Sequence, residues 1–545
     1  MSSTSELDGV VTVSEAQRFP LSGEPVCVLC GRYGEYICDK TDEDVCSIEC
    51  RDRALERAAS RALQQKFGIT VTGAGVDILL ATEFHLLHLH DDLYANMQRE
   101  RYDHPTPVQM QVLPYMLQHR HLVVGSPTGT GKTLAYLIPL VAHVIDHRMD
   151  VDVHHIIGVI LAPVRELCVQ LETQAKALMK GIPKMKTALL VGGIPLPNQL
   201  HRLKKGVQLI VATPGRLYEL VTEFTLDLSH VVCCVLDEVD MLVDAGDFES
   251  KVVAILAALP LSRQMVLVSA TITPAVLKFA QTHLHEAIHV SVASTATSSL
   301  PNSTTRQVIH YVDSPEAKKQ HFFAWLQAKC VPGDTDNSIL VFVSSKVGAD
   351  MLAKSIVKAC NIPALAIHSE KTQAQRLSII QSFVDGAAPI LVSTGVLGRG
   401  MNLLSVDDVV VFDLPPTIEE YVHLIGRAGR QPGSDDATAG TATVYIGAEN
   451  TSLLPKLLPL LRKHDAVIPD ELKREAVRER TRAMAQRQSQ VQDASKSAYH
   501  AARQMSTAQH QARWQQWAIE QPKRKVVELT AAQTQHKKFK FIAMS

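Results

Sequence analysis

The feature that most constrains the fold is a repeated alternation of short apolar runs with longer amphipathic stretches. From about residue 81 to 290 the runs are HLVVG, IIGVILAP, VQLIVATP, VVCCVLDE and QMVLVSAT. From 305 to 447 they are SILVFVSS, ALAIH, PILVST, VVVFDLP and ATVYIG. Continuous apolar runs separated by helices are typical of parallel strands buried on both faces. The pattern predicts two α/β domains in tandem, at 81–292 and 305–460, joined by a small-residue linker at 293–304.

Size and composition agree with this organisation and narrow the setting of the protein. At ~100–200 residues per domain, the 545 residues fit roughly three folded units, and a hydrophobic content of 46% supports large cores. No apolar run approaches the ~18 residues that span a bilayer. The first ten residues lack the basic and apolar parts of a secretory signal. We therefore expect an intracellular chain, nuclear or cytoplasmic, without membrane contact.

Half of the cysteines are clustered near the N-terminus. Five of the ten lie between Cys27 and Cys50, which does not resemble the framework of a disulfide-rich secreted domain. The pairs Cys27–Cys30 and Cys46–Cys50 supply four thiolates, enough for one tetrahedral Zn²⁺. The residues between the pairs carry too little apolar surface to fold unaided. We predict a zinc finger at 25–52, the alternative being reduced cysteines without a metal.

The sequence GSPTGTGKT at 125–133 directly follows one apolar run and precedes an amphipathic segment. This strand, loop and helix context is the one in which such a loop binds nucleotide phosphates, because its backbone N–H groups and the helix N-terminus surround the anion. Lys132 would bridge the β- and γ-phosphates of ATP, and Thr133 would bind Mg²⁺. The residues expected around the phosphates are Ser126, Thr128, Gly129, Thr130, Gly131, Lys132 and Thr133.

A second nucleotide motif, Asp237-Glu238-Val239-Asp240, follows the apolar run VVCCVL. Acidic residues at the carboxyl end of a parallel strand face the crevice in which these sheets bind ligands. Asp237 would hold Mg²⁺, and Glu238 would orient and deprotonate the attacking water. Together the two motifs predict an NTPase.

Further motifs, in order and at matching spacing, resemble the DEAD-box RNA helicase family. The segment Tyr102–Gln109 is similar to the family's Q motif, in which Gln109 would bind the adenine edge, with Phe84 upstream stacking on the base. The resemblance implies two RecA-like domains that bind RNA together and close on ATP. It implies RNA contacts by Pro163, Arg165, Gly192, Gly193, Thr213, Pro214, Gly215, Arg216, Ser344, Thr394 and Gly395.

The same resemblance implies how hydrolysis is coupled to movement of the domains. Coupling residues would be Asp240, Ser269, Thr271 and His423. Arg427 and Arg430 resemble the family's arginine fingers, which would reach the γ-phosphate from the second domain, and Gln373 and Arg376 fit its Q-x-x-R element. In related phosphoryl transfers such fingers accelerate the reaction roughly 10³–10⁵-fold.

Four positions depart from the family pattern. Val239 replaces Ala in the DEAD tetrapeptide, Val164 replaces Thr, and Leu424 replaces Arg after the histidine. Asn402 occupies the position where an Asp commonly contacts the ribose and couples the domains. An Asn retains hydrogen bonding but carries no charge, so the alternative to a helicase is an ATP-binding RNA clamp or scaffold with little unwinding. A DNA translocase is a third alternative, disfavoured by the Q motif and by TPGR at 213–216.

The cysteine cluster resembles the HIT-type zinc finger, whose two zinc sites interleave. The two cysteine pairs match the first site, and Cys38 matches one ligand of the second. Thr41 stands at the next expected ligand position, and neither His nor Cys follows Cys50 before His85. We therefore predict one zinc ion. A HIT-type finger before a DEAD-box core resembles a subgroup of these helicases, and the finger implies a protein partner.

The remaining segments are predicted from composition. We expect 1–24 to be disordered, 53–80 to form a linker helix and 461–545 to be a helical and then disordered tail. Residues 471–545 hold 15 Lys and Arg but 6 Asp and Glu, an excess of nine positive charges on a chain whose net charge is −1. This basic tail is either an accessory contact for a polyanion or a solvated segment. We expect the chain to be monomeric.

Overall fold

The computed structural model describes residues 10–73, 75, 78–127, 129–147, 155–244, 247–292, 305–330, 337–395, 406–429, 440–463, 466–479, 481 and 511. The chain forms two compact units, 1–469 and 470–545. In the second unit residues 470–479 are helical, and nearly all of the predicted basic tail lies outside the described residues. Within the described part, no helix has the length and apolar character required to cross a membrane.

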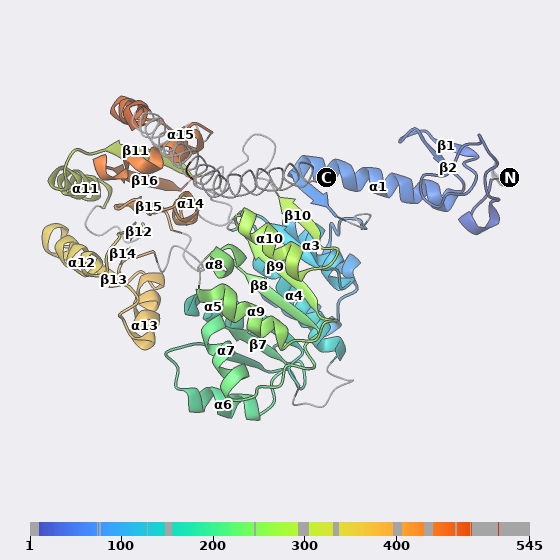
Figure 1. The fold of residues 1–545 in the computed structure, drawn as a ribbon, viewed down its shortest axis with the longest axis horizontal. Coiled ribbons are helices and arrows are strands. Elements are labelled where there is room, and N and C mark those ends of the chain that lie inside the picture. The colour runs from blue at the N-terminus through green and yellow to red at the C-terminus, as the bar shows by residue number, and fades with distance from the viewer. Residues whose placement is uncertain are drawn as a thin grey trace, which may run out of the picture. The chain divides into compact units, whose positions relative to one another are not determined.

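The N-terminal finger is built on a two-stranded hairpin and a long helix (Figure 1). Strand β1 (Tyr36–Cys38) pairs antiparallel with β2 (Glu43–Val45), and α1 (Ile48–Phe67) follows. The hydroxyl of Ser47 accepts a hydrogen bond from the N–H of Cys50 at 3.2 Å and so caps α1. The helix ends at Gly68, whose left-handed φ of 62° suits glycine.

The prediction of disorder over 1–24 is wrong for the part that the structure describes, residues 10–24. Here the chain packs on the finger, with a short 3-10 helix at Ser14–Ala16. The N–H of Ile48 donates to the carbonyl of Val11 at 3.0 Å, which satisfies a helix N–H that lacks a partner within α1. The Arg18 guanidinium pairs with Glu24 and lies 4.0 Å from the ring centre of Tyr33. These contacts leave no periodic sequence pattern.

The first lobe, residues 69–292, contains an eight-stranded sheet in the order β3-β10-β4-β9-β8-β5-β7-β6. Every neighbouring pair is parallel except β3 and β10, which are antiparallel. The strands are β3 (Ile69–Thr72), β4 (Leu122–Gly125), β5 (Gly158–Leu161), β6 (Thr187–Leu190), β7 (Leu209–Ala212), β8 (Cys233–Asp237), β9 (Gln264–Ser269) and β10 (Ile288–Val292).

Helices cover this sheet (Figure 1), and its central strands β4, β9, β8, β5 and β7 are buried on both faces. Along β4, Leu122 and Val124 belong to one hydrophobic cluster and Val123 to a second, as the alternation of side chains in a strand requires. The helical elements are η2 (Phe84–Leu87), α2 (Asp91–Arg99), α3 (Pro107–Leu117), α4 (Lys132–His147), α5 (Arg165–Leu178), α6 (Leu196–Lys204), α7 (Pro214–Glu223), α8 (Val239–Asp244), α9 (Asp247–Ala257) and α10 (Pro274–His283).

The second lobe, residues 306–463, contains a six-stranded, entirely parallel sheet in the order β11-β16-β15-β12-β14-β13. Its strands are β11 (Arg306–Tyr311), β12 (Ile339–Phe342), β13 (Ala364–Ile367), β14 (Ile390–Ser393), β15 (Asp408–Val411) and β16 (Thr441–Ile446). Its helical elements are α11 (Pro315–Lys329), α12 (Lys346–Cys360), α13 (Gln373–Val384), α14 (Ile418–Ile425), η3 (Ala448–Leu453) and α15 (Leu454–Lys463).

The predicted fold class of two tandem parallel-sheet domains is confirmed, and each of the ten apolar runs contains a strand. The structure differs within the expected linker helix at 53–80. Helix α1 ends at Phe67, and β3 then adds to the edge of the first sheet. Because β3 pairs only with β10 and exposes alternate side chains, it lacks the continuous apolar run that marks the central strands.

Candidate active site and zinc centre

The loop between β4 and α4 lies at the carboxyl end of the first sheet. The N–H of Ser126 donates to the carbonyl of Ser269, 3.2 Å away, which ties the loop to the end of β9. The hydroxyls of Ser126 and Thr130 are 2.7 Å apart. Gly129 and Gly131 have φ angles of 77° and 90°, in the left-handed region that favours glycine. The loop therefore takes the shape that its glycines make accessible, next to the N-terminus of α4.

Lys132 is half-buried within this loop. Its ammonium donates hydrogen bonds to the carbonyls of Ser126 and Pro127, at 2.5 and 2.6 Å. Burial lowers the pKa of Lys132 to about 8, while the carboxylates of Asp237 and Glu238 oppose this shift. A partly buried ammonium held by two neutral carbonyls gains strongly from an anion, so the position suits a phosphate.

Two carboxylates stand at the end of β8. The Tyr136 hydroxyl donates a hydrogen bond to Oδ2 of Asp237 at 2.7 Å. Burial, reinforced by the neighbouring Glu238, raises the pKa of Asp237 to about 6. A buried carboxylate whose charge is poorly compensated is a good ligand for a hard divalent cation. These surroundings, with Thr133 at the start of α4, fit Mg²⁺.

Glu238 has an unusual backbone conformation, with a φ of 50°. Its N–H donates to Oδ1 of Asp237 at 2.9 Å, and its buried Oε2 has no hydrogen-bond partner among the residues that the structure describes. Strained residues of this kind cluster at functional sites. An acceptor without a protein partner beside the phosphate loop can receive a hydrogen bond from a water molecule.

The two predicted adenine contacts, Gln109 and Phe84, lie in different surroundings. The amide of Gln109 connects the Q motif to the phosphate loop: Oε1 accepts from the N–H of Thr106 and Nε2 donates to the carbonyl of Gly131, both at 3.0 Å. Phe84 is 2% exposed and belongs to the hydrophobic core of the first lobe. An adenine can reach this ring only if neighbouring side chains move, so stacking on Phe84 stays a prediction.

The four predicted coupling residues lie together. Oδ2 of Asp240 accepts a hydrogen bond from the Thr271 hydroxyl at 2.5 Å and lies 3.3 Å from Nε2 of His423. The Ser269 hydroxyl accepts from the N–H of Thr271 at 3.1 Å. Burial raises the pKa of Asp240, but the hydrogen bond and charge of His423, with the Thr271 hydroxyl, outweigh it and lower the pKa to about 2. A side chain of the second lobe, His423, thus contacts a buried carboxylate of the first lobe, Asp240.

Arg427 also brings the second lobe to the catalytic carboxylates. It is 5% exposed, and burial lowers its pKa while the charge of Glu238 raises it. The charge of Arg427 in turn lowers the pKa of Lys132. A buried cation of the second lobe whose charge interacts with Lys132 and with Glu238 has the character expected of an arginine finger. The remaining predicted nucleotide contacts, Thr128, Asn402 and Arg430, lie outside the described residues.

Three of the predicted RNA contacts in the first lobe, Arg165, Gly192 and Gly193, lie together, and Arg165 begins α5 just after Pro163. The Arg165 guanidinium lies over two glycines. A Cβ built on Gly192 would be 2.8 Å from its Nη2, and one on Gly193 would be 2.6 Å from its Nη1. Gly193 also has a φ of 82°. The glycine pair therefore makes room for a cation at this surface.

The other predicted RNA contacts lie at the ends of strands or the starts of helices. Thr213 is the N-cap of α7, which begins Pro214-Gly215-Arg216. The Ser344 hydroxyl and N–H both donate to Oδ2 of Asp413, at 3.0 and 2.9 Å. Thr394 and Gly395 directly follow β14.

One further contact joins the lobes, between Arg376 of the Q-x-x-R element and Glu166, which was not among the predicted site residues. Nη2 of Arg376 on α13 lies 2.8 Å from Oε2 of Glu166 on α5, and both side chains are buried. A charged pair buried between two α/β domains needs both partners, since either charge alone would pay a large desolvation penalty. Glu166 stands beside the predicted Arg165, yet its partner is more than two hundred residues away in the sequence.

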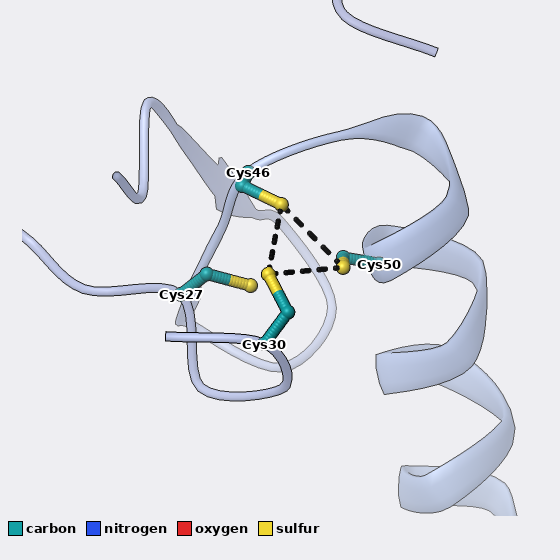
Figure 2. Close-up of side chains that lie close together, drawn as sticks. All are labelled: Cys27, Cys30, Cys46 and Cys50. Atoms are coloured by element: carbon teal, nitrogen blue, oxygen red, sulfur yellow. Dashed lines mark hydrogen bonds between the residues drawn. The ribbon is translucent and has the colours of Figure 1, made fainter. Parts of the chain in front are cut away.

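The four predicted zinc ligands converge in the finger, where Figure 2 shows their thiols turned toward one another. The Sγ–Sγ distances are 3.3 Å for Cys30–Cys46, 3.5 Å for Cys46–Cys50 and 3.8 Å for Cys30–Cys50. Four thiolates at ~2.3 Å around a tetrahedral Zn²⁺ are about 3.8 Å apart. None of the four forms a disulfide, and three of them are buried, so the cluster fits a structural zinc ion.

Comparison with known proteins agrees with this geometry. Residues 106–279 match the DEAD/DEAH box helicase model, 324–432 the helicase conserved C-terminal domain and 23–52 the HIT zinc finger. DEAD-box ATP-dependent RNA helicase 41 of Arabidopsis thaliana is 40% identical over 493 residues, which cover 85% of this chain and 94% of the relative. The chain belongs to the DEAD-box ATP-dependent RNA helicases. Its finger belongs to the HIT zinc fingers.

Two further matches place this helicase among relatives of known name or structure. The probable ATP-dependent RNA helicase DDX59 of Homo sapiens is 37% identical over 504 residues, which cover 85% of this chain and 78% of the relative. The structure of Mss116p bound to ssRNA and AMP-PNP aligns with a TM-score of 0.63 and 24% identity, over 75% of this chain and 84% of the other. At that identity the likeness supports the fold alone.

Proposed function

We propose that this DEAD-box helicase is an RNA-stimulated ATPase that separates short RNA duplexes or remodels RNA–protein particles. The proposal rests on the contact between Nε2 of His423 in the second lobe and Oδ2 of Asp240 in the first, which are 3.3 Å apart, and on the burial of Arg427 in the second lobe. A site completed by both lobes turns over only when they are together. The movement of one lobe against the other is then linked to the cleavage of ATP.

In the proposed reaction each residue has a distinct task. Lys132 holds the β- and γ-phosphates, and Thr133 and Asp237 would hold Mg²⁺, which would neutralise phosphate charge. Glu238 accepts a proton from water, whose oxygen bonds to the γ-phosphorus as the bond to the ADP oxygen breaks. Arg427 stabilises the charge on the transferring phosphoryl group.

The RNA partner is proposed to lie across both lobes. Arg165, above the Gly192-Gly193 pair, presents a cation to a phosphate of the RNA backbone. Ser344 and Thr394 would contact the backbone from the second lobe. Contacts of this kind, to phosphates and 2′-hydroxyls, read little sequence. We therefore propose binding without strong sequence preference.

The finger is proposed to hold one zinc ion through Cys27, Cys30, Cys46 and Cys50 and to bind a protein partner. Its surface exposes large apolar side chains, with Phe19 69%, Leu21 70% and Ile37 65% exposed. Exposed apolar side chains gathered on one small unit are typical of a protein-binding surface. Beyond this contact we propose a monomeric enzyme.

A second candidate, an ATP-binding RNA clamp with slow turnover, is favoured by Asn402, which carries no charge where the family commonly has Asp. Steady-state ATP hydrolysis with and without RNA separates the two candidates. A helicase is stimulated by RNA, whereas a clamp binds both ligands and releases little phosphate.

The test of the proposed function is RNA-stimulated phosphate release by the wild type beside three variants. Lys132→Ala should lose ATP binding, and Lys204→Ala, which changes an exposed lysine on α6, is the matched control. Glu238→Gln should keep ATP and RNA binding but lose about 10²–10⁴ in turnover, because it removes the base. Normal RNA-stimulated turnover by Glu238→Gln would exclude Glu238 from the proposed role.

A further inference from the structure

A second group of metal-binding side chains lies in the first lobe, outside the sites described above. It consists of His155, Asp227 and His230, at the amino ends of β5 and β8. These strands pair in parallel, with Gly158 opposite Cys233. His155 lies three residues before Gly158, and His230 lies three residues before Cys233. The pairing continues outward from the strands, since the N–H of Val232 donates to the carbonyl of Ile157 at 2.9 Å. The backbone therefore holds the two histidines side by side.

The three side chains are close enough to share one ion. The imidazole ring centres are 3.8 Å apart, with the rings inclined by 50°. One ring nitrogen of each histidine and one carboxylate oxygen of Asp227 lie within 4.8 Å of one another. Three ligands at ~2.0–2.1 Å from a tetrahedral ion are about 3.3 Å apart. Binding of an ion would therefore draw the three ligand atoms closer together.

The aspartate is fixed in place by its own turn. Oδ1 of Asp227 accepts a hydrogen bond from the N–H of Ser229 at 2.9 Å. The turn therefore fixes the carboxylate beside the two imidazoles, where it can serve as a ligand.

The three residues stand on a rigid base. Leu228 and Val231, on either side in the sequence, are buried in the hydrophobic cluster on one face of the sheet, and so is Ile156. Asp227 and His230 are exposed and His155 is half-buried. Anchored backbone with ligand side chains at the surface leaves the site open to ions from solvent.

We propose that His155, Asp227 and His230 bind a divalent transition-metal ion, with Zn²⁺ the fitting example. Two imidazoles and one carboxylate are a donor set for borderline ions of this kind, and they leave coordination positions open to water or to a partner's side chain. Within the described part of the chain, this trio and the four finger cysteines are the two groups with such geometry.

The proposed ion would not take part in ATP hydrolysis. His230 precedes and Asp237 ends the same strand, seven residues apart, which is about 23 Å of extended chain. The ion would instead join the start of β8, the strand that carries the catalytic carboxylates, to the start of β5. The proposal is independent of the proposed function, since it requires neither ATP nor RNA.

The test measures zinc bound by the full chain that retains zinc in its finger. After dialysis against buffered micromolar Zn²⁺, mass spectrometry of metals should find one more equivalent per chain than after dialysis against metal-free buffer. His155→Gln and His230→Gln should each lose the added equivalent. Asp227→Asn keeps the turn but loses the charge, and should bind at least about tenfold more weakly. His201→Gln, an exposed histidine on α6, is the matched control.

The outcomes decide the proposal in either direction. It is supported if the added equivalent disappears in both histidine variants while the finger zinc and the RNA-stimulated ATPase are unchanged. It is overturned if the wild type takes up no added equivalent, or if both variants bind it as the wild type does. Changes in the ring nitrogen resonances of two histidines on zinc addition, absent in the variants, would identify the ligands directly.

Discussion

Because His423 and Asp240 form a hydrogen bond between the lobes, we expect removal of the Asp240 charge to weaken RNA binding in the nucleotide-bound state. Asp240→Asn keeps the size of the side chain and can still accept from Thr271, but it no longer presents a carboxylate to Nε2 of His423. We expect this variant to bind RNA normally without nucleotide and weakly with a non-hydrolysable ATP analogue. The reason is that the contact exists only when the lobes are together.

The magnitude follows from the pKa of Asp240, which is lowered from 3.8 to about 2. At 1.36 kcal/mol per pKa unit this corresponds to about 2 kcal/mol, and His423 supplies the two largest lowering contributions. Because the pKa is depressed, the stabilisation is fully present above pH ~4 and is lost only as the pH falls toward 2. At neutral pH the change should weaken analogue-dependent RNA affinity about 30-fold.

The assay is a double-mutant cycle on RNA affinity with the analogue bound. Asp240→Asn, His423→Gln and the double variant should show nearly equal losses, because each removes the same interaction. Asp350→Asn is the control within one lobe: Asp350 lies 3.1 Å from Nε2 of His368 and 2.9 Å from Nζ of Lys371. The proposed inter-lobe contact would be refuted if the loss of RNA affinity in the double variant equalled the product of the two single losses. It would also be refuted if Asp350→Asn lost as much affinity as Asp240→Asn.

Three further outcomes follow from the described geometry. The kcat/KM for ATP should be bell-shaped in pH, falling below about 6 as Asp237 is protonated and above about 8 as Lys132 loses its proton; a flat profile from pH 5 to 9 would contradict this. Gly193→Ala introduces about 1–2 kcal/mol of strain and displaces Arg165, so RNA should bind about tenfold more weakly in a filter assay, with ATP affinity unchanged. Chelation of zinc should make residues 25–52 sensitive to protease while RNA-stimulated ATPase persists, and equal resistance of the finger with and without zinc would argue against a structural ion.

Most of the fold could be predicted because central strands of a parallel sheet are buried on both faces. Such strands produce unbroken apolar runs, as in VVCCVLD at the position of β8. The strands that were missed differ physically. In β10 (IHVSV) and β11 (RQVIHY) polar and apolar residues alternate, and β3 and β11 stand at the edges of their sheets. Partial exposure permits polar residues there, which removes the signal.

In the candidate site, the residues of contiguous motifs could be predicted from the sequence, whereas contacts between distant residues could not. The phosphate loop and the acidic pair are contiguous motifs, so the sequence locates them directly. Tyr136, which donates to Asp237, carries a weak signal as a tyrosine in the helix after the loop. The left-handed backbone of Glu238 and the pairing of Arg376 with Glu166 depend on the folded chain and leave no trace in spacing.

Helix α1 connects the zinc finger to the ATP-binding first lobe. Its first turn carries Cys50, and near its other end Gln64 donates to Gln111 of α3 at 2.7 Å, while the Ser60 hydroxyl accepts from the N–H of Leu80. Twenty residues of helix form a rod of about 30 Å. A protein bound to the finger would act on the ATP-binding lobe through this rigid helix. Its binding would therefore favour one arrangement of the lobes during each cycle of ATP hydrolysis.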